Sequence, residues 1–228
     1  MKKAGILCAA DTELHPFLKR MDVERVVEKA MLRFYEGTIL GIPAIAVYSG
    51  VCRVNAAIAA ELLIERFGAD GVINAGTAGG VDPKVRLFDT VIAERSVYHD
   101  VSEDILTEFH PWLPSAYFPS GEELLSAARS CAETRPILFG TIATGERFIE
   151  SEAHRERIRR AYAPLAVDME TAAVAHVCYV NRVPFLAVRS ITDTAGGTGA
   201  ADFERNCEQA SEIAAEITIS ILQNWSGA

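Results

Sequence analysis

Short apolar segments alternate with amphipathic helical segments along nearly the whole chain, and no other feature constrains its fold as strongly. Apolar runs of strand length predict strands at residues 4–9, 32–40, 43–49, 71–75, 87–97, 137–143 and 165–168, with a last run that starts at Val183. Helical patterns fill the intervals at residues 12–20, 55–67, 121–133, 152–161, 170–180 and 202–223. We therefore predict a single domain over residues 1–228, an α/β protein of three layers (α/β/α) with a twisted, mixed central sheet.

Two segments depart from this alternation. Gly41 lies between the strands predicted at 32–40 and 43–49 and predicts a hairpin. Residues 98–120 hold three prolines, two histidines and Trp112 without a clear period, so we expect a long irregular segment there. Long loops inside compact domains are often lids or interface segments.

The charge balance excludes one class of partner. The formal net charge is −9, whereas binding to a nucleic-acid backbone requires clustered Lys and Arg. We expect no nucleic-acid partner. A small nucleoside carries no phosphate and is compatible with this charge.

The cysteines and the apolar segments indicate a compartment. The five cysteines are scattered and form no C-x-x-C pair, which favours reduced thiols over a disulfide framework or a zinc site. The apolar part of the N-terminal segment is too short for a signal peptide, and no later segment is long enough to span a membrane. We expect a cytoplasmic protein without a membrane partner.

Asp193 is the most informative single residue. It follows the apolar run from Val183, and open α/β sheets bind ligands beyond the carboxyl ends of their strands. A carboxyl group partly withdrawn from water there can keep a proton and donate it. Taken alone, the segment fits better with an acid that caps a helix or orders the loop at Gly196–Gly197, because such acids are commoner.

Three further polar segments follow strand candidates, at 8–13, 74–80 and 167–170, and each has a plain structural interpretation. Glu13 and Glu170 can be acids at helix starts, and Met169 can be a packing residue. The glycines of 74–80 can form a tight turn. This run lacks the order of a dinucleotide-binding G-x-G-x-x-G and the Lys of a phosphate-binding P-loop.

Together, in their order and spacing, these segments and three others resemble the 5′-methylthioadenosine/S-adenosylhomocysteine nucleosidase family of the purine nucleoside phosphorylase superfamily. The resemblance extends from about Lys3 to the final helix. The matching pieces are Glu13, Ser49-Gly-Val51, Asn74-Ala-Gly-Thr-Ala-Gly-Gly80, Tyr98-His-Asp100, Gly145-Glu-Arg-Phe-Ile149, Val167-Asp-Met-Glu-Thr-Ala172 and Arg189-Ser-Ile-Thr-Asp193.

The resemblance implies a division of roles. Asp193 is the general acid that protonates N7 of adenine, and Glu13 is the base that activates water. The implied substrate-binding residues are Thr77 and Arg189, which help to hold the water, Glu170 at the ribose 2′-hydroxyl, Met169 below the sugar, Phe148 stacked on adenine, Ile149 at the purine edge, Val51 and Asp168. The resemblance also implies a homodimer in which residues 98–120 reach the neighbouring site, and neither a metal nor an organic cofactor.

The chemistry of N-glycosidic cleavage fits these residue types. The purine becomes a better leaving group when an acid protonates it, and water needs its own base on the sugar side. An Asp has a reference pKa near 3.9, so it donates at neutral pH only if desolvation or hydrogen bonding favours its neutral form. We expect Thr192 and the apolar run before Asp193 to provide that environment.

Two alternative activities remain open. A phosphorylase would hold phosphate with arginines, but the first loop contains Asp11 and Glu13, and this negative charge favours water. Arg53 is a candidate phosphate ligand, although a structural or surface role is expected. The other alternative is a hydrolase for another 5′-modified nucleoside, such as an aminofutalosine-type compound.

The chain departs from the family pattern at four places. Asp168 stands where the family usually has Glu, and Cys52 where a glycine is common. Glu103 adds charge near the expected site for the 5′-substituent, which leaves the preferred substituent open. The glycine-rich segment 196–199 is a candidate lid. The candidates for contact with a neighbouring subunit are Trp112, Leu113 and Pro114. The candidates for the 5′-tail subsite are Ile105 or Leu106. We expect the charged run Arg155–Arg160 on a solvated helix face.

Overall fold

The computed structural model of the chain describes residues 2–109, 113–132, 136–149, 151–194 and 200–226. Its strands are β1 (Ala4–Cys8), β2 (Met21–Lys29), β3 (Leu32–Ile39), β4 (Ile42–Tyr48), β5 (Gly71–Gly80), β6 (Thr90–Tyr98), β7 (Tyr117–Pro119), β8 (Ile137–Thr144), β9 (Ala166–Asp168) and β10 (Phe185–Asp193). Its helices are α1 (Asp11–Leu18), α2 (Arg53–Glu65), α3 (Glu103–Glu108), α4 (Glu122–Ala132), α5 (Glu152–Tyr162), α6 (Thr171–Asn181) and α7 (Ala200–Ser226).

The strands form one sheet, in the order β10-β6-β8-β9-β5-β1-β4-β3-β2. Strand β1 is parallel to β4 and β5, and β5 is parallel to β10, whereas β3 and β4 are antiparallel. The predicted mixed sheet is thus confirmed. Because β10 pairs with both β5 and β6, the strands β5, β10, β6, β8 and β9 close on themselves. The parallel strands β1, β5 and β10 therefore end at the same edge of the sheet.

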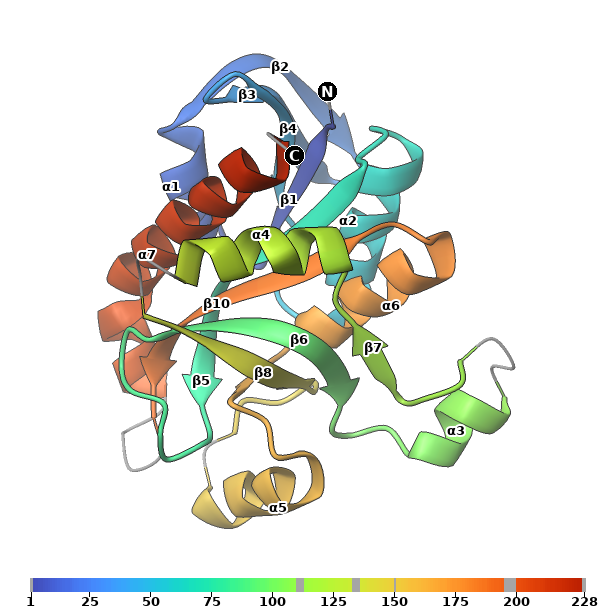
Figure 1. Ribbon diagram of the computed structural model, residues 1–228, viewed down its shortest axis with the longest axis vertical. Coiled ribbons are helices and arrows are strands. Elements are labelled where there is room, and N and C mark those ends of the chain that lie inside the picture. Colours follow the sequence, from blue (N-terminus) through green and yellow to red (C-terminus); the bar gives the residue numbers. More distant parts are fainter. Residues whose placement is uncertain (1, 110–112, 133–135, 150, 195–199, 227–228) are drawn as a thin grey trace.

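Helices cover both faces of this sheet (Figure 1). On one face, α2 and α6 contribute small residues such as Ala59 and Ala172 to a buried core that also contains Phe34. On the other face, α1, α4 and α7 contribute Phe17, Leu124 and other apolar residues to a second core. These faces are the layers that the alternation of segments predicts, because each amphipathic helix buries its apolar face against the sheet.

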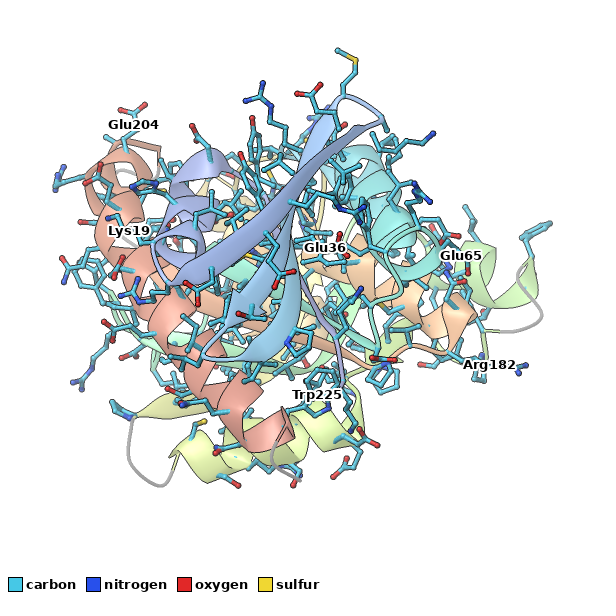
Figure 2. All side chains as sticks on the ribbon, turned by 90° about the horizontal axis from the view of Figure 1, so that it is seen from above. Lys19, Glu36, Glu65, Arg182, Glu204 and Trp225 are labelled. Atoms are coloured by element: carbon cyan, nitrogen blue, oxygen red, sulfur yellow. The ribbon has the colours of Figure 1, made fainter. Side chains whose placement is uncertain are left out.

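Helix α7 connects the two ends of the molecule. It has 27 residues, which corresponds to about 40 Å at the rise of an α-helix. Figure 2 shows Glu204 near its first turn and Trp225 near its last. Trp225 is 2% exposed and lies over Gly71, where a Cβ atom would come within 3.0 Å of the indole ring. Among the described helices, none combines the length and the apolar composition needed to cross a bilayer.

The β3–β4 hairpin is confirmed, but strand β2 is absent from the sequence-based prediction. Leu40 and Gly41 have φ angles of 51° and 77°, the combination of a two-residue type I′ turn. Strand β2 pairs with β3, and nearly all of its residues are at least partly exposed. Charged residues interrupt the apolar ones along β2, so the strand lacks the pattern of a buried strand. Exposed charges are typical of an edge strand that avoids pairing with other chains.

Residues 98–120 are more regular than expected. The segment contains α3, and β7 pairs with β6 as an additional strand. Leu113 is 2% exposed and belongs to the core of its own chain, so its predicted contact with a neighbouring subunit is wrong. Pro114 is exposed, and Trp112 lies outside the described residues. Short strands such as β7 carry too few residues to show a period.

Candidate active site

A cavity of about 290 Å³ lies at the carboxyl ends of β1, β5, β9 and β10, where open α/β sheets bind their ligands. The predicted site residues that line it are Glu13, Val51, Thr77, Phe148, Ile149, Asp168, Met169, Glu170 and Asp193. Arg189 is the exception, because it is fully buried beneath the cavity. The cavity thus gathers segments that are widely separated in the sequence.

Glu13 lies in the first turn of α1 and is only 4% exposed. Its Oε2 accepts hydrogen bonds from the backbone N–H groups of Ala9 at 2.8 Å and Ala10 at 3.2 Å. Its Oε1 accepts from the backbone N–H and the hydroxyl of Thr77 at 2.7 and 2.8 Å. In each of these hydrogen bonds the partner is the donor, so the carboxylate of Glu13 acts as the acceptor. A general base needs a carboxyl group that accepts in this way.

The glycines of 74–80 make this arrangement possible, and they do not form the tight turn that was one interpretation of their sequence. They lie within β5, and none of them has a positive φ angle. A Cβ atom on Gly76 would lie 2.5 Å from the carboxyl carbon of Glu13, far inside van der Waals contact. Glycine is therefore required here for close approach of a side chain, and not for turn conformation.

Asp193 is the last residue of β10 and is 4% exposed. Burial raises the pKa of its carboxyl group above the ordinary value, as the sequence-based argument requires. The role expected for Thr192 is wrong, because its hydroxyl donates to Oδ1 of Asp193 at 3.0 Å and so lowers this pKa. The positive charge of Arg155 also lowers it, and burial outweighs both effects.

Glu170 lies at the N-terminus of α6 and is 4% exposed. Its Oε1 accepts a hydrogen bond from the backbone N–H of Cys52 at 2.9 Å. Burial and the neighbouring Asp168 raise the pKa of Glu170, while Arg189, 3.8 Å from its Oε2, acts in the opposite direction. The carboxyl group thus lines the cavity with its Oε1 held by Cys52 and its Oε2 beside Arg189.

Arg189 organises the floor of the cavity. Its Nη2 donates to Asn74 Oδ1 and to the Thr171 hydroxyl, and lies 2.7 Å from Oδ2 of Asp168. Its Nη1 is buried and has no hydrogen-bond partner among the described residues. One end of this guanidinium is therefore fixed, and the other retains donor capacity.

The opposite wall is aromatic and apolar. Phe148, which is 40% exposed, meets Phe203 of α7 edge to face, with ring centroids 6.5 Å apart. Ile149 follows it and is buried, and Met169 lies between the two polar residues Asp168 and Glu170. A planar apolar ligand can stack on Phe148 while its polar edge faces Asp193.

Known proteins match the chain over nearly its full length. A family model described as the phosphorylase superfamily matches residues 3–223. A 5′-methylthioadenosine/S-adenosylhomocysteine nucleosidase from Geobacillus thermodenitrificans is 36% identical, with 96% of each chain covered. The chain belongs to this nucleosidase family.

Solved structures agree with the family assignment. The nucleosidase of this family from Colwellia psychrerythraea, solved in complex with adenine, is 32% identical with a TM-score of 0.88, and 98% and 95% of the two chains are covered. A futalosine hydrolase from Helicobacter pylori is 28% identical with a TM-score of 0.89, and 97% of each chain is covered. The mixed sheet with its small closed part is therefore a fold shared with nucleosidases.

Cys52 is a departure from the family pattern with a clear structural consequence. Its φ and ψ angles are 84° and 160°, a conformation that non-glycine residues rarely adopt. Nevertheless its backbone N–H donates to Glu170, so the strained residue supports a side chain of the site. The usual glycine would adopt this conformation without strain.

Asp168, the second departure, is fully engaged by the protein. Thr144 Oγ1 donates to its Oδ1 at 2.6 Å, Thr171 donates through both its backbone N–H and its hydroxyl, and Arg189 pairs with Oδ2. The shorter side chain thus stays with the floor of the cavity, and positions Arg189 and the start of α6.

Arg53 has the structural role expected of it. Its Nε lies 2.7 Å from Oε1 of Glu146, and its Nη1 lies 2.9 Å from Oδ1 of Asp100. The backbone N–H of Glu146 also donates to Asp100 at 3.0 Å. This ion-paired group joins the loop after β4 to the loop that carries Phe148, and its two carboxylates oppose binding of phosphate by Arg53.

Arg155 is a site residue that the sequence did not indicate. We expected it on a solvated helix face, but it is 6% exposed and lines the cavity. The helical period of α5 places Ile158 and Arg155 on its buried side. That period is visible in the sequence, so the signal existed, although a charged residue at such a position is uncommon.

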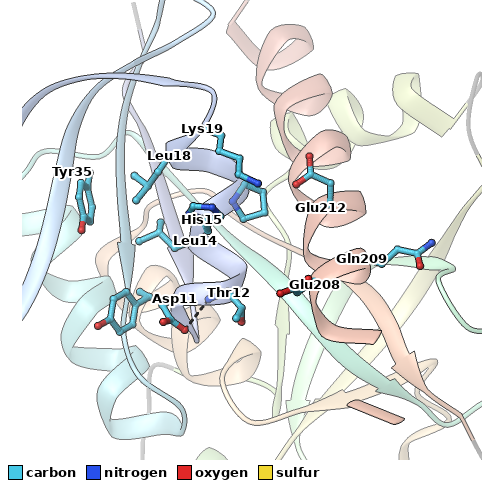
Figure 3. Close-up of a pocket in the computed structure, with 12 residues that line it drawn as sticks. Asp11, Thr12, Leu14, His15, Leu18, Lys19, Tyr35, Glu208, Gln209 and Glu212 are labelled. Carbon is cyan, nitrogen blue, oxygen red and sulfur yellow. Dashed lines mark hydrogen bonds between the residues drawn. The ribbon is translucent and has the colours of Figure 1, made fainter. Parts of the chain in front are cut away.

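A second, wider hollow of about 670 Å³ lies between α1, α7 and the strands β3 and β4 (Figure 3). It is lined by charged side chains of both signs, including Asp11, Lys19 and Glu212, and contains none of the predicted site residues.

Within the described residues, no group of three His, Cys, Asp or Glu side chains is placed to hold a metal. The candidate lid 196–199 lies outside the described residues.

Proposed function

We propose that the protein hydrolyses the N-glycosidic bond of 5′-methylthioadenosine and S-adenosylhomocysteine, releasing adenine and the 5′-thioribose. The observation that carries this proposal is the pair of carboxyl groups on one cavity. Glu13 is held by donors as an acceptor, whereas burial raises the pKa of Asp193. One carboxyl is thus suited to accept a proton and the other to donate one.

Asp193 acts on the purine. In its neutral form it donates its proton to N7 of adenine, and the electron pair of the bond between ribose and adenine moves onto the ring. Phe148 stacks on the ring, and the backbone of Ile149 contacts its outer edge. The position of Asp193 at the end of β10, with Phe148 and Ile149 on the same cavity, supports these roles.

Glu170 and Glu13 act on the sugar side. Glu170 binds the ribose 2′-hydroxyl and strengthens this contact as positive charge develops on the sugar. Glu13 accepts a proton from the attacking water. A water-binding position beside Glu13 is supported by two observations. Thr77 already donates to Glu13, and Nη1 of Arg189 has no hydrogen-bond partner in the described part of the chain.

Phosphorolysis is the less favoured alternative. The nucleophile side of the cavity carries Glu13, which is held as a hydrogen-bond acceptor and would repel phosphate. Arg53, the candidate phosphate ligand, is paired with two carboxylates instead. Water carries no charge and meets no such repulsion.

Hydrolysis of a futalosine-type nucleoside is also not favoured over the main proposal. The 5′-methylthioadenosine/S-adenosylhomocysteine nucleosidases compared above are more similar in sequence than the futalosine hydrolase. Glu103 is exposed on α3 and is not among the residues that line the cavity, so it adds no charge to the cavity of its own chain.

The proposal includes a homodimer in the cytoplasm. Val51, Val54 and Ile58 form an apolar stripe at the start of α2 that is 43–70% exposed, and Val51 also lines the cavity. Ile105 and Phe109, which are 50% and 73% exposed, lie on α3 and just after it, and α3 projects from the body of the molecule (Figure 1). A second copy of the chain would cover this stripe and bring its α3 segment to the open side of the cavity.

Five free cysteines support a reducing compartment, where the products would feed methionine salvage.

Adenine release tests the proposed function. The purified protein is incubated with 5′-methylthioadenosine, S-adenosylhomocysteine, adenosine and futalosine, each with and without phosphate, and free bases are quantified by chromatography. We expect release from the two thio-nucleosides at rates that phosphate does not change. Turnover that requires phosphate would replace the proposal with a phosphorylase, and preference for futalosine would change the substrate class.

A further inference from the structure

Arg155 is a buried cation on the purine side of the cavity for which the proposed reaction has assigned no task. It lies on α5, whose Glu156, Arg157 and Arg160 face solvent at least in part, yet it is 6% exposed. Among the described residues its ion-pair partner is Glu152 at 3.5 Å, whose side chain is 70% exposed. A guanidinium in such a position loses hydration that one exposed carboxylate replaces only in part.

The contacts of Arg155 join two separate walls of the cavity. Its Nη2 donates to the backbone carbonyl of Ile149 at 3.3 Å, and its Nη1 donates to the backbone carbonyl of Thr194 at 3.5 Å. Ile149 directly follows Phe148, and Thr194 directly follows Asp193. The planar guanidinium therefore fixes the loop that contacts the purine relative to the strand end that carries the acid.

The charge of Arg155 also acts on Asp193. The groups that face Asp193 are the hydroxyl of Thr192 on β10, Arg155 on α5 and Asp202 on α7. Arg147 and Glu204 line the same cavity with opposite charges. Among these groups, Thr192 and Arg155 favour the ionised form of Asp193, and Asp202 opposes it.

We propose that Arg155 is a positioning residue of the reaction, which holds the purine-contacting loop against the end of β10 and stabilises Asp193 once it has lost its proton. This inference rests on the proposed function. As the proton of Asp193 moves to N7, the electron pair of the glycosidic bond moves to adenine, and Asp193 becomes negatively charged. The adjacent guanidinium stabilises this charge more than it stabilises the neutral acid, so it favours the transition state.

The inference is tested with Arg155→Leu, Arg155→Lys and, as a matched control on the same helix, Arg159→Leu. The side chain of Arg159 is 42% exposed and, within the described residues, forms an ion pair with Glu156 alone. Adenine release is measured across pH, and adenine binding is measured separately by calorimetry. A positioned general acid contributes roughly 10²- to 10⁴-fold, so we expect Arg155→Leu to lower kcat by at least about tenfold.

The pH profile separates this role from a purely structural one. Removal of a cation that lowers the pKa of Asp193 moves the alkaline limb of kcat/KM to higher pH, whereas Arg155→Lys restores the limb in part. Adenine binding weakens in Arg155→Leu because the loop at Ile149 loses its anchor. Arg159→Leu leaves all three quantities unchanged.

Two outcomes would overturn the inference. Arg155→Leu with wild-type kcat and an unmoved alkaline limb, even if less stable to heat, would reduce Arg155 to a structural residue. If Arg155→Leu does not fold, a wild-type profile and wild-type adenine binding in Arg155→Lys would do the same. Absence of turnover in the wild-type protein would instead overturn the proposed function, and adenine binding would still decide the anchoring role.

Discussion

At the scale of single residues, the surroundings of each carboxyl group decide its chemistry. Among the described residues, Glu13 receives four hydrogen bonds from donors, whereas Asp193 receives one from Thr192, and burial raises its pKa against the effects of Thr192 and Arg155. The sequence placed both acids after strand candidates, but only the three-dimensional contacts distinguish an acceptor from a proton donor. We therefore expect substitutions that keep shape and remove charge to separate binding from turnover.

Asp193→Asn tests the acid. The amide keeps the shape of the carboxyl group but has no acidic proton, so we expect kcat to fall by roughly 10²- to 10⁴-fold while substrate still binds. Single-turnover kinetics and calorimetry measure the two quantities, with the exposed Asp22→Asn as control. Near wild-type turnover in Asp193→Asn would assign the acid to another residue.

Glu170 makes stability depend on pH. Because its pKa is raised in the folded protein, the folded state binds this proton more tightly than the unfolded chain does. The free energy of unfolding therefore decreases as pH rises from the unfolded value, about 4.3, through the raised folded value. Glu170→Gln keeps an oxygen acceptor for the backbone N–H of Cys52 and removes the ionisation.

Urea unfolding between about pH 4 and about pH 8 measures this effect, since the window spans the unfolded pKa and the raised folded one. We expect the wild-type protein to lose more stability over this range than Glu170→Gln does. An equal loss in both proteins would show that Glu170 is ionised equally easily in the folded and unfolded states.

At the scale of elements, the segments that the sequence misassigned are those in which a neighbour determines conformation. The glycines of β5 have a turn-like composition, but they are extended because they pair with β10. Glycine is needed there because the carboxyl groups of Glu13 and Asp193 approach Gly76 and Gly79. Strand β2 has no buried face to produce a pattern. The long apolar runs of β1, β4 and β10 were predicted well because burial on both faces determines their composition.

The connection between β4 and α2 carries backbone strain at Cys52. We expect Cys52→Gly to raise the free energy of unfolding by about 1 kcal/mol, because relief of strain exceeds the added entropy of the unfolded chain. Denaturant unfolding measures this change. Cys52→Ala is the matched control, since it removes the thiol but retains the strain, and equal stability of the Gly and Ala variants would contradict this explanation.

At the scale of the whole molecule, the predicted fold class and the gathering of the site residues follow from one topological fact. Parallel strands end at one edge of a sheet, so polar residues after each apolar run meet there. Arg155 and Phe203 were missed because they reach the cavity from helices α5 and α7. The period of α5 shows which side of the helix is buried, but it does not show that this side meets the cavity. Cys52 was recognised as unusual, but its φ angle required the structure.

The exposed stripe on α2 predicts the state of assembly. A charge within a buried interface is strongly unfavourable, so we expect Val54→Asp with Ile58→Asp to convert a dimer to monomers. Analytical ultracentrifugation measures the mass, and Val23→Asp, on the exposed β2, is the control. A monomeric wild-type protein would show that there is no dimer interface. A double variant that remains dimeric would show that the interface lies elsewhere.

Hydrolysis in water enriched in ¹⁸O tests the central claim most directly. If Glu13 activates water and Asp193 protonates the purine, mass spectrometry of a single turnover of 5′-methylthioadenosine in the presence of phosphate will find ¹⁸O in the sugar product and none of the sugar as a phosphate ester. A sugar phosphate, or a sugar formed without the label, would contradict attack by water and with it the role of Glu13.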